Sequence, residues 1–145
     1  MTAAAILALL AAAGAALVLQ NALMLEARAV SGSVWVALWL NSAVGLVVLT
    51  AVALTSDGIE AFARLAQGRL WMFLLPGLLG TFFVFASLTG YASLGATLTI
   101  SALIAAQVTA GVGFDLWRGS AITPAQILGL ALLVAGTALV FGAKA

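Results

Sequence analysis

Five apolar stretches, each long enough to cross a lipid bilayer, decide what this chain can fold into. A hydrocarbon core about 30 Å thick needs about 20 apolar residues per helix, and the sequence has such runs at residues 2–23, 34–55, 70–91, 94–114 and 124–142. None shows the two-residue alternation of a transmembrane β-strand. The sequence therefore predicts an all-α integral membrane protein with five transmembrane helices, and we expect residues 1–145 to form a single transmembrane domain.

The charged residues support these boundaries because they avoid the five stretches. Only 6% of the chain is charged, and a charge at the centre of a bilayer costs about 2.5 to 3.5 kcal/mol on insertion scales. We expect Glu26 and Arg28 in the first loop, Asp57, Glu60, Arg64 and Arg69 in the second, Asp115 and Arg118 in the fourth, and Lys144 in the tail. The first apolar run lacks a basic start and is too long for a signal peptide, so we expect a retained helix.

Neither cysteine nor histidine occurs in the sequence. Disulfides, thiolate nucleophiles, imidazole bases and the usual zinc and haem ligands are therefore excluded. We expect no enzyme activity, no bound metal and no cofactor. The net charge is +1 and the basic residues are scattered, so we also expect no nucleic-acid partner.

Two segments carry local structural signals. Thr123 can cap a helix, and Pro124 fits the first helical position, where its missing N–H costs nothing. Residues 56–69 are amphipathic enough for a short helix at the membrane surface, but a plain polar loop fits them equally well. The sequence leaves both alternatives open for this segment.

The loop charges only weakly favour one orientation in the membrane. With five crossings, Arg64, Arg69 and Arg118 lie on the side of the N-terminus, whereas Arg28 and Lys144 lie on the opposite side. The positive-inside rule then places the N-terminus in the cytoplasm and the C-terminus outside. Three charges against two is also the pattern of a dual-topology protein, or of one member of an oppositely oriented pair.

Glycines mark faces where helices can pack closely, since lipid supplies no hydrophobic push between helices. Gly129 and Gly136 lie seven residues apart on the last predicted helix and share a face. That face packs either inside the subunit or across a dimer. On the third predicted helix, Gly77 shares a face with Tyr91, and Gly80 lies beside it. This second face is either a packing seam or the wall of a cavity.

Polar side chains inside the predicted spans are candidates for a transport pathway, because polar groups in hydrocarbon need partners. Gln107 faces either another helix or a watery pathway. Asp115 ends the same span, either paired with Arg118 or standing at a cavity mouth. The remaining polar candidates are Gln20, Asn21, Asn41, Ser42 and Ser101. Ser101 belongs to a hydroxyl stripe that can also bond its own backbone without any ligand.

The polar and small residues occur in an order that resembles a known family. The order runs through Gln20, Gly32-Ser33, Gly45, Gly77, Gly80, Leu94-Gly95-Ala96, Gln107, Asp115, Gly129 and Gly136. It is similar to the YdcZ-like family of small bacterial inner-membrane proteins, within the drug/metabolite transporter superfamily, over nearly the whole chain. The resemblance implies a location in the bacterial inner membrane. It also implies a transport unit of two five-helix halves, inverted relative to each other.

Two positions depart from the family pattern. Met24 stands where the family usually has Asn, four residues after Gln20, and Leu116 follows Asp115 where the family usually has His. A site that uses that Asn or His is therefore not expected in this subunit. They favour a heterodimer, in which a related chain keeps the polar groups, over a homodimer.

Together these features predict a subunit of a small secondary transporter that moves a small organic solute by alternating access. The cavity would lie between two antiparallel five-helix chains, paired as a homodimer or a heterodimer within membrane lipid. Candidate cavity residues are Gln20, Asn41, Ser42, Tyr91, Ser101 and Gln107, with Asp115 near the mouth. The alternatives are a small dual-topology channel and an accessory membrane protein that transports nothing.

Overall fold

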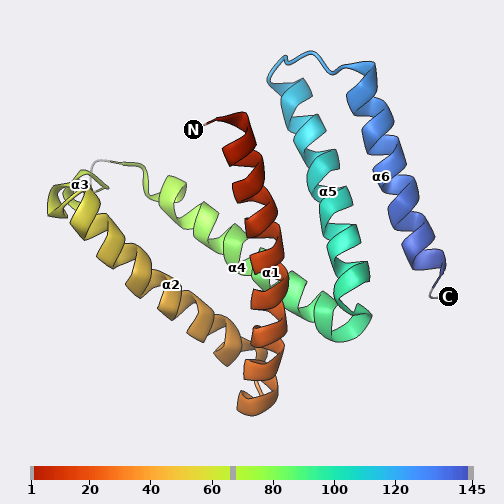
Figure 1. Cartoon of the computed structure of the whole chain (residues 1–145). Helices are drawn as coiled ribbons and strands as arrows, with labels where there is room; N and C mark the ends of the chain where they lie inside the picture. The colour runs from red at the N-terminus through yellow and green to blue at the C-terminus, as the bar shows by residue number, and fades with distance from the viewer. Residues whose placement is uncertain (1, 66–67, 144–145) are drawn as a thin grey trace. The chain divides into compact units, whose positions relative to one another are not determined.

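The fold is helical throughout the residues that the structure describes. The computed structural model describes residues 2–65 and 68–143, so the expected tail charge at Lys144 lies outside the described residues. The described residues form α1 (Ala3–Ser31), α2 (Val34–Ser56), α3 (Ile59–Leu65), α4 (Leu70–Leu94), α5 (Ala96–Trp117) and α6 (Pro124–Gly142) (Figure 1). Each helix except α3 is long and apolar enough to cross a membrane. The prediction of five membrane-length helices is therefore confirmed.

Helix α1 is longer than predicted. The sequence predicts an end at Leu23, but the helix continues to Ser31, so Glu26 and Arg28 lie on the helix. The prediction that these two charges lie in a loop is wrong. The helix stops where Gly32 adopts the left-handed conformation (φ 69°) and donates its N–H to the Arg28 carbonyl, a conformation that glycine adopts most easily. Its 29 residues give a length of about 43 Å at 1.5 Å per residue, which exceeds the hydrocarbon core.

Helices α4 and α5 are separated by one residue, Gly95, whose φ is 85°. Helix α4 continues through Leu94, a residue predicted to begin the next span. Helix α5 runs to Trp117, so Asp115 lies on the helix and not in the loop that the sequence predicts. The helix continues past Phe114 because no glycine or proline interrupts it between Phe114 and Gly119. Gly119 again has a left-handed φ, of 78°.

Helix α6 begins where the sequence predicts. The Thr123 hydroxyl accepts the Gln126 N–H at 3.3 Å, and the Gln126 side-chain oxygen accepts the Thr123 N–H at 2.7 Å. This reciprocal pair is a capping box, and Pro124 follows it at the first helical position. The predicted start of this helix is confirmed.

The connection between α2 and α4 contains the short helix α3, one of the two alternatives that the sequence left open. Ile59, Phe62 and Leu65 recur every three residues along it, and all three side chains are exposed. This spacing gives α3 an apolar stripe. Its location at the membrane surface stays a prediction.

The described residues group into two compact units, the first ending at Leu88 and the second beginning at Thr89, within α4. In the first unit α1 packs against α2, and the Trp35 ring of α2 stacks on Phe85 of α4 with centroids 5.1 Å apart. The core of this unit consists of Met24, Ala37, Leu38 and Leu88. The single transmembrane domain stays a prediction.

In the second unit, α5 and α6 lie side by side (Figure 1). The Thr137 hydroxyl of α6 donates to the Ser101 carbonyl of α5 at 3.3 Å. The end of α4 approaches α5 closely at Gly90, where an added Cβ would lie 2.6 Å from Cγ2 of Thr99. This contact requires a glycine.

Most large apolar side chains point away from the packed core. Leu7, Leu78 and Leu139 have 66%, 68% and 75% of their surface exposed. A soluble protein rarely exposes contiguous apolar surface on this scale. In a bilayer the same surface is stable, because helices that satisfy their own backbone can face lipid.

Candidate functional site

A polar contact joins the two helices of the first hairpin. Gln20 of α1 donates from Nε2 to Oδ1 of Asn41 on α2 at 2.8 Å. The two residues meet because the connection Gly32-Ser33 turns the chain back, and the Ser33 hydroxyl then starts α2 by accepting the Val36 N–H at 3.4 Å. The hairpin thus brings together two candidate residues that lie 21 positions apart in the sequence.

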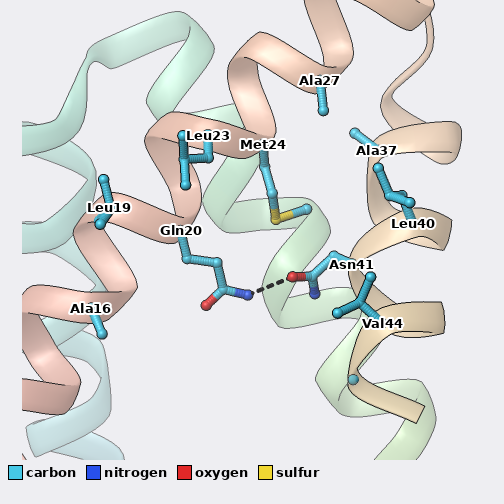
Figure 2. Close-up of a pocket in the computed structure, with 11 residues that line it drawn as sticks. Ala16, Leu19, Gln20, Leu23, Met24, Ala27, Ala37, Leu40, Asn41 and Val44 are labelled. Atoms are coloured by element: carbon cyan, nitrogen blue, oxygen red, sulfur yellow. Dashed lines mark hydrogen bonds between the residues drawn. The ribbon is translucent and has the colours of Figure 1, made fainter. Parts of the chain in front are cut away.

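An open groove of about 540 Å³ lies between α1 and α2 at this contact. Pockets for small ligands typically measure about 300 to 1,000 Å³. Figure 2 shows Gln20 and Asn41 pointing towards each other, with the Met24 side chain nearby. The groove is lined by Ala16, Leu19, Gln20, Leu23, Met24, Ala27, Ala37, Leu40, Asn41, Val44 and Gly45. Apart from the Gln20–Asn41 pair, which we call the amide pair, the lining side chains are apolar.

The amide pair has hydrogen-bond donors and acceptors that its own contact does not use. Each carboxamide carries two N–H donors and an oxygen with two lone pairs, and the contact uses one Gln20 N–H and one lone pair of Asn41. Within the part of the chain that the structure describes, neither side chain makes another hydrogen bond. Gln20 Oε1 and the Asn41 Nδ2 hydrogens are therefore available to a molecule in the groove.

Within the part of the chain that the structure describes, no ionisable side chain lines the groove. Glu26 and Arg28 lie further along α1 and are absent from the lining. A charged solute in the groove would lose its water without meeting an opposite charge there, which is costly. The groove therefore offers hydrogen bonds and apolar contact, but no charge pairing.

Asn21, the residue next to Gln20, faces the core. It is 2% exposed, its Nδ2 donates to the Leu17 carbonyl at 3.0 Å, and its Oδ1 accepts a hydrogen bond from the Ser87 hydroxyl of α4 at 3.2 Å. Adjacent helical positions differ by about 100° in direction, so one amide opens to the groove while the next is buried. Hydrophobic periodicity could not separate these roles, because both faces of α1 are apolar.

Three other predicted cavity residues lie outside this groove. Ser42 follows Asn41 on α2, but it is exposed and does not line the groove. Tyr91 and Ser101 belong to the second unit. Tyr91 is 6% exposed, and its hydroxyl is buried without a hydrogen-bond partner among the described residues. Ser101 contributes its backbone carbonyl to the contact between α5 and α6.

Gln107 and Asp115 are both exposed on α5. The Gln107 amide makes no hydrogen bond within residues 2–65 and 68–143. Arg118 places its guanidinium carbon 5.7 Å from the Phe114 ring centroid and, within the same residues, forms no ion pair with Asp115. Of the two alternatives for Asp115, pairing with Arg118 is therefore not formed among the described residues, and a position at a cavity mouth stays a prediction.

The four predicted packing glycines make no close approach to the residues that the structure describes. An added Cβ would meet no heavy atom of those residues within 4 Å at Gly77, Gly80, Gly129 or Gly136. Their packing across a dimer stays a prediction. A close approach of α4 and α5 occurs instead at Gly90, which is not among the predicted packing glycines. The available signal was Gly95, since a glycine-marked turn brings the ends of two consecutive helices together.

The chain is similar to known inner membrane proteins over most of its length. Residues 5–139 match a family described as "Putative inner membrane exporter, YdcZ". A similar protein is "Inner membrane protein YdcZ" of Escherichia coli (strain K12), which is 41% identical over 138 residues that cover 92% of this chain and 93% of that protein. No solved structure matches the chain.

Proposed function

The chain belongs to the YdcZ family and is a multi-pass inner membrane protein. We propose that it is one subunit of a small secondary transporter for an organic solute. The matching family is described as an exporter, and we extend that direction to this chain. The proposed mechanism is alternating access, in which the binding groove opens to one side of the membrane at a time.

The amide pair in its apolar groove is the observation that carries this proposal. Gln20 lies near the middle of α1, and Asn41 contacts it from α2. A carboxamide that faced hydrocarbon would forfeit its remaining hydrogen bonds. A solute that supplies those bonds would bind at the depth where carriers hold their substrates.

The groove lies open along one side, so one chain alone does not enclose a solute. We propose that a second five-helix chain, inverted in the membrane, closes it. The open glycine positions of α6 and the Gln107 amide have no contact or hydrogen bond of this kind within the described residues, so a second chain could use them. The nearly balanced loop charges permit both orientations.

Counterflow in proteoliposomes tests the proposal. Vesicles that contain the purified chain, with and without a related five-helix chain, are loaded with a panel of unlabelled organic solutes and exposed to the same solutes carrying a radiolabel. A carrier accelerates uptake of the solute that it recognises, and the rate saturates. Gln20→Leu and Asn41→Leu should each slow this exchange about tenfold, as expected for a lost hydrogen bond in binding.

Thr55→Val on α2 is the matched control, because the Thr55 hydroxyl donates to the Ala51 carbonyl of its own helix at 3.0 Å. This variant should exchange solute at the original rate. Flux that does not saturate and is not accelerated by solute on the opposite side would indicate a channel. No flux for any solute would support an accessory protein.

A further inference from the structure

We propose that the groove between α1 and α2 selects an uncharged solute that carries a donor and an acceptor at one end and an apolar body behind them, as a primary aromatic amide does. This inference rests on the proposed function, because it names the class of solute that the transporter carries. It is drawn from three properties of the groove: its free hydrogen-bonding groups, its lack of charge, and its apolar lining.

The free groups of the amide pair define the polar end of the solute. Gln20 Oε1 accepts and Asn41 Nδ2 donates, while the contact between the two residues holds both groups in place. A primary carboxamide satisfies both, since its N–H can reach the Gln20 oxygen and its carbonyl can accept from Asn41. A carboxylate only accepts and an ammonium only donates, so each leaves one group of the pair unmet.

The lack of charge in the lining excludes ions on energetic grounds. Among the described residues, no Asp, Glu, Lys or Arg lines the groove, and the lining side chains other than the amide pair are apolar. A benzoate or benzylammonium ion would be desolvated without a counter-charge, whereas a neutral amide exchanges hydrogen bonds with water for hydrogen bonds with the amide pair.

The apolar lining accommodates the body of the solute. Met24 lies one helical turn after Gln20 on the same face of α1, is 6% exposed, and lines the groove. Leu40 and Val44 line it from α2. A thioether is flexible and makes favourable contact with aromatic rings. An aromatic ring behind the carboxamide would therefore pack against Met24.

Three probes of similar shape separate the classes: benzamide is neutral, benzoate is an anion and benzylammonium is a cation. Binding of each tritiated probe to the purified chain in lipid nanodiscs is measured by scintillation proximity, with empty nanodiscs subtracted. Benzamide should bind saturably and about tenfold more tightly than either ion, because each ion forfeits at least one hydrogen bond of the pair.

Variants assign the binding to the groove. Gln20→Leu and Asn41→Leu should each weaken benzamide binding about tenfold, and Met24→Ala should weaken it without changing the order of the three probes. The double variant Gln20→Asn with Asn41→Gln keeps two carboxamides of the same combined length and should restore most of the affinity. Thr55→Val should bind like the original chain. Thermal unfolding of every variant shows which remain folded, and the order of the probes on the original chain needs no variant.

Tighter binding of either ion, no saturable benzamide binding, or benzamide binding unchanged in folded Gln20→Leu and Asn41→Leu would each overturn the inference. Failure of the proposed function looks different. Benzamide binding that depends on the amide pair, without exchange of any solute in vesicles, would refute the proposed transport but support the selectivity of the groove. Exchange of an organic ion that is insensitive to Gln20→Leu would support transport but refute the selectivity of the groove.

Discussion

The Ser87 hydroxyl of α4 donates a hydrogen bond to the Asn21 side chain of α1, and both residues are almost fully buried. The contact ties α1 to α4 across 66 positions of sequence. Neither residue lines the groove. Its expected role is therefore to hold the first unit together rather than to bind solute.

Ser87→Ala and Asn21→Leu should each lower the free energy of unfolding by about 0.6 kcal/mol, and by no more than about 1.7 kcal/mol, the mean and the maximum for hydrogen bonds between membrane helices. The double variant should lose less than the sum of the single losses, because each change removes the same Ser87–Asn21 bond. Reversible unfolding of the purified chain in mixed detergent and lipid micelles measures these values, with Thr55→Val as control. Strictly additive losses would show that the two side chains do not interact.

Gly90→Ala should destabilise the second unit by about 1 to 3 kcal/mol, as overpacking does. The added methyl group would lie 2.6 Å from Cγ2 and 2.8 Å from Oγ1 of Thr99, and Thr99 is buried. Adding Thr99→Ala should recover part of the loss. Gly111→Ala on α5 is the matched control, since its methyl group would meet no heavy atom of the described residues within 4 Å. The same unfolding assay measures these losses. Equal losses of unfolding free energy in the two glycine variants would contradict the close approach of Gly90 to Thr99.

Gln107→Leu should reduce solute exchange about tenfold if the amide meets solute or the second chain, while the amount of protein in the membrane stays the same. The reason is that the exposed Gln107 amide has no partner within the described residues. Thr109→Val on the same helix is the control, because the Thr109 hydroxyl already bonds the Ala105 carbonyl at 2.7 Å. Unchanged exchange by Gln107→Leu would limit the residue to a structural contact.

The open glycines of α6 predict the geometry of a dimer. Gly129 and Gly136 lie at nearly equal distances from the centre of the helix (Pro124–Gly142), so two antiparallel α6 helices that cross at their centres would place Gly129 beside the partner's Gly136. Mixed Gly129→Cys and Gly136→Cys proteins should then form more disulfide-linked dimer than either variant alone. Ile127→Cys should form little, because Ile127 is exposed and lies nearly opposite the two glycines around α6. The chain has no native cysteine, so every crosslink reports an introduced site.

Two outcomes of this crosslinking would correct the dimer model. Crosslinked copies of this chain that transport fully without a second protein would exclude the heterodimer that Met24 and Leu116 favour. An active protein that remains monomeric in nanodiscs would exclude the dimer itself.

The loop charges predict five crossings with the N-terminus in the cytoplasm. Alkaline phosphatase fused after residue 145 should then be active, whereas the same enzyme inserted at Gly119, in the loop before α6, should be inactive. Green fluorescent protein at the same two sites should give the opposite pattern. Activity of both reporters at each site would indicate dual topology. A cytoplasmic C-terminus with the Gly119 loop outside would reverse the orientation, whereas both sites in the cytoplasm would rule out five crossings.

The five spans could be predicted because apolar length alone decides whether a segment crosses a bilayer. The start of α6 could be predicted because Thr123, Pro124 and Gln126 act locally. The end of α1 could not be predicted, because charged residues next to an apolar span usually indicate a loop, whereas Glu26 and Arg28 also fit a helix that extends beyond the hydrocarbon core. The actual stop is Gly32, one glycine among 15 in the chain.

The sequence predicts which residues belong to the candidate site better than it predicts which side chains they contact. Gln20 and Asn41 stood out because amides are rare inside apolar spans. Their contact depends on the register of the α1–α2 hairpin, which the Gly32-Ser33 connection sets. The division between Gln20 in the groove and Asn21 in the core was equally hidden, since membrane helices lack the polar outer face that reveals direction in soluble proteins.

The two-residue connection between α1 and α2 also bears on how the protein is made. Every residue that lines the groove lies between Ala16 and Gly45, so the groove depends on contacts that are local in sequence and cost little loop-closure entropy. A ribosome that has released this hairpin into the membrane has already delivered the complete set of lining residues, while α4, α5 and α6 are still being synthesised. Assembly of the solute groove is thereby separated in time from the pairing of chains, and a truncated product that ends after α2 would carry all of its lining residues.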